Sequence, residues 1–83
     1  MIQVNKNGLP LYEKSQNEHG GVIIRVKKTV YYYDLKRITD FVCSNENRLN
    51  IKTIGLSERE NINGDLARSL YAALLDWHKG LIK

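Results

Sequence analysis

The sequence predicts one α+β domain over residues 1–83, a two-layer sandwich with two helices on one face of a mostly antiparallel sheet of about four strands. Three observations predict this fold. Two segments alternate apolar and polar residues, as strands with one buried face do. Two others repeat apolar residues every third or fourth position, as amphipathic helices do. The short chain also leaves too little sequence for a second core. The expected order is β-hairpin, strand, helix, strand, helix.

The first expected element is the β-hairpin. Residues 2–4 and 9–12 are apolar segments on either side of residues 5–8, which end in an Asn-Gly pair. Such a pair favours a hairpin because both residues tolerate the positive φ of a tight turn. Pro10 has no amide hydrogen to donate, so the second strand is expected at a sheet edge. Residues 14–21 are polar, end in two glycines and predict an exposed loop.

Two further segments predict strands. In residues 22–26 (VIIRV), the apolar side chains at alternate positions share one face, and Arg25 lies on the other. In residues 48–54 (RLNIKTI), Leu49 and Ile51 share one face while Arg48 and Lys52 share the opposite one. Each strand is therefore expected to turn an apolar face to the core and cations to the open side of the sheet.

Residues 31–43 predict the first helix, because their apolar residues follow a spacing of three and four. These residues are Tyr31, Leu35, Ile38, Phe41 and Val42. A strand through residues 29–33 is the competing interpretation, since β-branched and aromatic residues favour strands. We take the helix as the expectation and keep the strand as its alternative.

The last segment predicts the second helix. Asp65 is the expected N-cap, and Gly80 followed by Leu81 suits a left-handed C-cap with a Schellman contact toward Leu75. Residues 57–60 (SERE) have the spacing of a capping box, although an Asn-Gly pair follows and interrupts any helix begun there. The apolar stripe between the two ends keeps the helical period: Leu66, Leu70, Ala73, Leu74 and Trp77.

The positive charge is concentrated in the middle of the chain. Residues 22–52 hold seven cations and three acids, which accounts for the whole net charge of +4. Lys and Arg contact phosphates, and aromatic rings among them stack on unpaired bases. We therefore expect a small regulatory protein that binds nucleic acid, DNA or RNA, without catalysing a reaction. The candidate site residues are Arg25, Lys27, Lys28, Tyr32, Tyr33, Lys36, Arg37, Arg48 and Lys52.

Three other interpretations of these residues stay open. Lysines on a solvated face also keep strand edges from aggregating, and tyrosines are common at the rim of a core. The alternative function is a protein-binding module (an inhibitor, adaptor or small subunit) that recognises an acidic partner, since the same charge comes with tyrosines and Ile23, residue types enriched or tolerated at interface cores. A homodimer is also expected, because so short a chain has a small core and pairing adds buried surface.

Catalytic, cofactor and metal sites are not expected. Cys43, His19 and His78 are too few for a structural zinc site, which takes about four ligands. Cys43 with a histidine base would also need a third group to orient that base. No P-loop, G-x-G-x-x-G, H-E-x-x-H or G-x-S-x-G pattern occurs, so no small-molecule substrate is expected. The single cysteine, and the lack of a signal-peptide pattern or of an apolar run of about 18 residues, predict a cytoplasmic protein without membrane contact.

Overall fold

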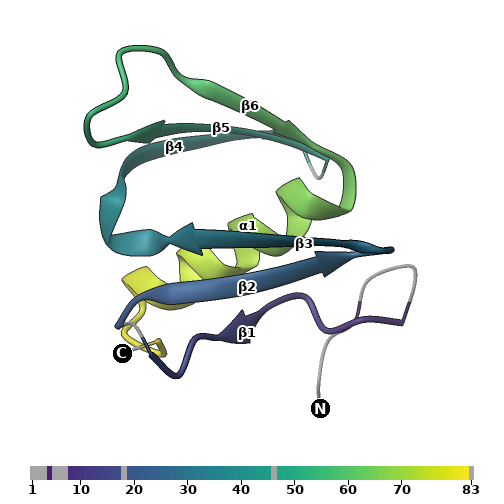
Figure 1. The fold of residues 1–83 in the computed structure, drawn as a ribbon. Coiled ribbons are helices and arrows are strands. Elements are labelled where there is room, and N and C mark those ends of the chain that lie inside the picture. Colours follow the sequence, from purple (N-terminus) through teal and green to yellow (C-terminus); the bar gives the residue numbers. More distant parts are fainter. Residues whose placement is uncertain (1–3, 5–7, 18, 46, 83) are drawn as a thin grey trace.

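A computed structural model of the chain describes residues 4, 8–17, 19–45 and 47–82. The described strands form two separate three-stranded antiparallel sheets, and one helix packs against both of them (Figure 1). The predicted single sheet of about four strands under two helices is therefore wrong. In chain order the elements are β1 (Glu13–Lys14), β2 (Gly21–Val26), β3 (Thr29–Asp34), the 3-10 turn η1 (Leu35–Arg37), β4 (Ile38–Asn45), β5 (Arg48–Thr53), β6 (Glu60–Asn63) and α1 (Gly64–His78).

The first sheet has the order β1-β2-β3 and the second has the order β4-β5-β6. β2 and β3 pair without a register shift from Gly21↔Asp34 to Val26↔Thr29. β4 pairs with β5 through two register shifts, between Ile38 and Asp40 and between Cys43 and Asn45. η1 turns the chain from the first sheet into the second (Figure 1). The sheets are thus joined covalently at one corner and held together by α1.

The predicted helix over residues 31–43 is wrong, because this segment is a strand, a 3-10 turn and a second strand. Tyr31 and Tyr33 alternate inward along β3 and pack against the core. Leu35 in η1 is buried, and Ile38 is buried where β4 begins. The inward-facing residues of the two strands and the turn between them are therefore spaced by two, two and three positions, and three of them (Tyr31, Leu35 and Ile38) are spaced by four and three. That spacing mimics a helical stripe, and the strand alternative through residues 29–33 is the one that the structure shows.

The predicted strands at residues 22–26 and 48–54 are present as β2 and β5, with their apolar faces turned to α1. Burying these side chains and those of α1 removes most of their apolar surface from water, which is the main force that stabilises the domain. The fully buried core comes from both sheets, η1 and the helix, and its largest members are Val22, Ile24, Leu35, Leu49, Ile51, Leu70 and Leu74.

α1 begins two residues earlier than its sequence predicts. Asn63 is the N-cap and forms no side-chain cap hydrogen bond, while Asp65, the expected cap, lies in the first turn. The expected C-cap is confirmed: Gly80 has φ 80°, and the amides of Gly80 and Leu81 donate to the carbonyls of Trp77 and Asp76. These are the two hydrogen bonds of a Schellman motif.

Two smaller expectations around α1 fail. The apolar residue buried after the C-cap is Ile82, whereas Leu81 is 64% exposed. No helix forms at residues 57–60, where Glu60 instead begins β6. The capping-box spacing is therefore coincidental. Among the described residues, no helix combines the length and apolar character that crossing a bilayer would require.

Contacts at residues 12–14 help to attach the segment before β2 to the fold. β1 pairs with β2, and the Tyr12 hydroxyl donates a hydrogen bond to the Asp76 carboxylate on α1. Burial, this hydrogen bond and the charge of Asp76 together raise the pKa of Tyr12 to about 12. Of the predicted N-terminal hairpin, the structure describes one bridge between Val4 and Pro10, and residues 1–3 and 5–7 lie outside the described residues.

Candidate functional site

The first sheet has an exposed face that we call its outer face. Val22 and Ile24 of β2 are buried toward α1, so the residues between them point the other way. The register places Ile23 opposite Tyr32 and Arg25 opposite Val30. The outer face therefore comprises Glu13, Ile23, Arg25, Val30 and Tyr32. Its apolar members remain accessible, since Val30 is 57% and Tyr32 49% exposed.

The Tyr32 ring lies across the sheet because Gly21 has no side chain. A Cβ atom added at Gly21 would lie 2.5 Å from the Tyr32 hydroxyl oxygen and 3.1 Å from two ring carbons. Any other residue at position 21 would therefore displace the ring. The result is a half-exposed aromatic surface in the middle of a sheet, which is the arrangement that single-stranded nucleic-acid proteins use to stack bases.

Candidate cations lie at both ends of the outer face. Lys27 and Lys28 form the two-residue turn between β2 and β3, and Lys27 adopts a φ of 55° there. Lys36 and Arg37 lie in η1, at the opposite end of β3 (Figure 1). A six-residue strand spans about 20 Å, so the two pairs of cations are about that far apart.

Between these ends, acids oppose part of the positive charge. Arg25 forms an ion pair with Glu13, with 2.8 Å between Nε and Oε2 and both side chains about half exposed. The Asp34 carboxylate accepts a hydrogen bond from the Lys36 amide and so caps η1. Among the described residues around this face and its ends, five cations thus stand against these two acids. The local charge remains positive.

Arg48 and Lys52 belong to a different surface. They lie on β5, in the second sheet, where Lys52 is opposite Asp40 and Arg48 is opposite Asn45. Arg59 also forms an ion pair with Asp40, with 3.0 Å between its Nη1 and Oδ2. The expectation that Arg25 and Lys52 share one open sheet face is therefore wrong, because β2 and β5 do not belong to one sheet.

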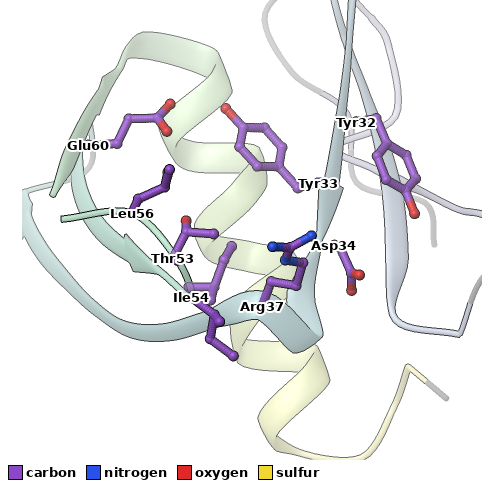
Figure 2. Close-up of a pocket in the computed structure, with 10 residues that line it drawn as sticks. Tyr32, Tyr33, Asp34, Arg37, Thr53, Ile54, Leu56 and Glu60 are labelled. Carbon is purple, nitrogen blue, oxygen red and sulfur yellow. The ribbon is translucent and has the colours of Figure 1, made fainter. Parts of the chain in front are cut away.

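A cleft of about 410 Å³ opens between β3 and β6. Tyr33 and Glu60 point toward one another across it, and Arg37, the last residue of η1, lies at the end of the cleft (Figure 2). Ile54 and Leu56, in the connection between β5 and β6, supply apolar walls and are 53% and 54% exposed. Each side of the cleft ends in an edge strand, because β3 and β6 are the last strands of their sheets.

The electrostatics of the cleft centre on Tyr33. Burial, followed by the negative charge of Glu60 and then by Tyr31, raises the pKa of Tyr33 to about 12, so its hydroxyl stays neutral. Sequence reasoning selected Tyr33 and Arg37 but missed Glu60 and Leu56, because it interpreted residues 57–60 as a capping box. The useful signal was the single apolar Ile62 among polar neighbours in residues 60–63, which is consistent with an edge strand.

The cysteine and the histidines are in separate environments. The Cys43 thiol donates to the Asn45 carbonyl at 3.1 Å. The ring of His78 packs on Phe41, and that of His19 packs edge-on against Trp77, each with centroids 5.5 Å apart. Within the part of the chain that the structure describes, no three His, Cys, Asp or Glu side chains are grouped to hold a metal ion.

Comparison of the chain with known protein families, with characterised proteins and with solved structures found no significant match.

Proposed function

We propose that the chain is a small, non-enzymatic regulatory protein that binds single-stranded nucleic acid across the outer face of its first sheet. One observation carries the proposal: an exposed aromatic ring lies in an open sheet face that has a pair of cations at each end. Tyr32 is that ring, with Lys27 and Lys28 at one end and Lys36 and Arg37 at the other. A cytoplasmic location, expected from the single cysteine, belongs to the same proposal.

The cations and the apolar residues of this face contact different parts of a single strand. Its phosphates need positive charge at intervals along the backbone, which the two ends and Arg25 provide. Its bases have apolar faces, which stack on Tyr32 and rest against Ile23 and Val30. A duplex hides those faces, so it gains only the phosphate contacts. We therefore expect single strands to bind more tightly than duplexes of the same sequence.

The direct test is a fluorescence-anisotropy titration with labelled oligothymidylate, oligouridylate and a duplex, at low and moderate salt. The expected result is salt-dependent binding of both single strands and weaker binding of the duplex. Absence of binding at low salt would overturn the proposal. Equal binding of duplex and single strands would overturn the stacking role of Tyr32.

A pair of charge-matched variants tests the surface itself. Lys27→Gln/Lys28→Gln removes two cations at the end of the outer face, and Arg48→Gln/Lys52→Gln removes two from the second sheet. Losing two phosphate contacts makes the slope of log K against log salt shallower by about 1.4. If the variant and the wild type bind equally at about 1 M salt, the variant therefore binds about 25-fold more weakly at about 0.1 M salt. We expect that loss for the first variant and little change for the second. Equal losses would show a diffuse charge effect rather than a binding face.

The exposed apolar residues of the outer face also support the second candidate function, a module that binds an acidic protein. Val30 and Tyr32 are residue types tolerated or enriched at the centre of protein interfaces. A pull-down from the native host, repeated after nuclease digestion, separates the two functions. A partner that is retained through Tyr32 after digestion would favour protein recognition over nucleic acid.

A further inference from the structure

We propose that the cleft between β3 and β6 accepts a guanine base of the bound strand and selects it through the carboxylate of Glu60. This inference rests on the proposed function and adds a base preference to it. The cleft lies beside the outer face, and the groups that line it match the hydrogen-bonding pattern of one base.

The cleft adjoins the outer face along the free edge of β3. Tyr32 and Tyr33 are consecutive, and their rings point to opposite sides of this strand (Figure 2). Both residues line the cleft, together with Asp34 and Arg37 at the end of the strand. A nucleic-acid strand that stacks one base on Tyr32 and crosses the edge of β3 therefore brings the next base to the mouth of the cleft.

The lining of the cleft suits a single flat polar ring. Its volume of about 410 Å³ lies within the range of about 300–1,000 Å³ for small-molecule sites. The Tyr33 ring and the side chains of Ile54 and Leu56 offer apolar surface to the faces of a base. Neither Glu60 nor Arg37 forms an ion pair with any described residue, so both charges are accessible to a ligand.

The charges select the base. An ionised carboxylate is an acceptor with two oxygens, so its best partner is a pair of adjacent donors. Guanine carries such a pair on its Watson–Crick edge, N1–H and the N2 amino group. Adenine and cytosine each place an acceptor beside their amino group, and thymine and uracil place one N–H between two carbonyls. Proteins commonly recognise unstacked bases through this edge.

Arg37 contacts the phosphate backbone of the nucleic acid rather than the base. It lies at the η1 end of the cleft, with a guanidinium nitrogen 3.9 Å from the position of a Cβ atom at Gly55. Glu60 comes from β6 on the other side of the cleft (Figure 2). A guanine paired with Glu60 therefore leaves its phosphate toward the guanidinium, which offsets the repulsion between the phosphate and the acids nearby.

The test compares oligothymidylate with strands of equal length that carry one central guanine, hypoxanthine or adenine. Hypoxanthine keeps N1–H but lacks the N2 amino group. One bidentate contact discriminates strongly between bases, so the guanine strand should bind about tenfold more tightly than oligothymidylate. The hypoxanthine strand should lie between them, and the adenine strand should gain nothing.

Two charge-matched variants locate the effect. Glu60→Gln should remove the guanine preference while leaving oligothymidylate binding intact or slightly stronger. Glu58→Gln makes the same change two residues earlier, at an exposed position that does not line the cleft, and should keep the preference. Folding of both variants is checked by circular dichroism.

Each outcome bears on one proposal. Tight binding of oligothymidylate without a guanine preference overturns the inference about the cleft and leaves the proposed function standing. A guanine preference that survives Glu60→Gln, or is lost in Glu58→Gln, overturns the assignment to Glu60. Failure of every strand to bind overturns the proposed function itself.

Discussion

Replacing Ser69 by alanine should stabilise the domain. Ser69 is fully buried in α1, and among the described residues its hydroxyl oxygen has no hydrogen-bond partner. A buried polar group without a partner costs about 1–3 kcal/mol, and alanine is a better helix former than serine by about 0.5 kcal/mol. Losing the packing contacts of one oxygen atom offsets part of this gain. We expect a net increase of about 1–2 kcal/mol in the free energy of unfolding.

Urea denaturation followed by Trp77 fluorescence and by circular dichroism measures this change. The transition midpoint should rise with an unchanged m-value, and the melting temperature should rise by about 5–10 °C. Ser44→Ala, the same substitution at an exposed position of β4, is the control and should change stability by less than about 0.5 kcal/mol. A destabilised Ser69→Ala variant would refute the reasoning, because it would mean that the hydroxyl forms a hydrogen bond worth keeping.

Two further predictions concern charge and pH. Glu13→Gln removes the carboxylate paired with Arg25, so single strands should bind about fivefold more tightly at about 0.1 M salt. Because both side chains are about half exposed, the ion pair contributes less than about 1 kcal/mol, and stability should barely change. Weaker binding in the same anisotropy assay would contradict this. The second prediction follows from the pKa values of Tyr12 and Tyr33, both raised from 10.0 to about 12. Folding favours their protonated forms, so this stability is fully present below pH 10.0 and is lost as the pH rises through about 12. Ultraviolet titration of the wild type should show two tyrosines that ionise late, and Tyr12→Phe and Tyr33→Phe should each lose one of them. If both tyrosines titrated near pH 10.0 while the protein stayed folded, the prediction would be contradicted.

The local elements with long, regular patterns could be predicted from the sequence. α1 has its apolar stripe and its glycine C-cap, and β2 and β5 alternate clearly, so each pattern matches the structure that formed. These signals are strong because one face of each element must be buried for the domain to fold. They say nothing about which strands pair, since pairing depends on residues far apart in the sequence.

The hairpin of β2 and β3 had no visible turn signal. Its two turn residues are Lys27 and Lys28, and Lys27 adopts a left-handed φ that glycine or asparagine usually supplies. Without that signal, the tyrosines after the turn were assigned to a helix. With β3 taken as a helix, the predicted fold has one strand fewer, and its remaining strands form a single sheet.

The candidate site was predicted in part. Arg25 lies on the outer face and the other cations lie at its two ends, because a hairpin and the turn after it keep them together, although Arg37 also lines the cleft and the Lys36 stem lies near Trp77. Tyr33 and the two cations of β5 do not, since strand alternation turns Tyr33 inward and β5 joins the second sheet. The cleft depends on how two sheets are set around a helix. No local pattern contains that information.

Among the described strands, the two long edge strands β3 and β4 differ in how readily another molecule can extend them. β4 is broken by two register shifts, which makes it a poor template for an incoming strand. β3 is regular along its whole length and presents an even row of backbone donors and acceptors at its open edge. A second copy that added itself there would occupy the path by which a base enters the cleft. The homodimer expected from the sequence and a base bound in the cleft would then exclude one another. Raising the protein concentration would therefore weaken the discrimination between bases.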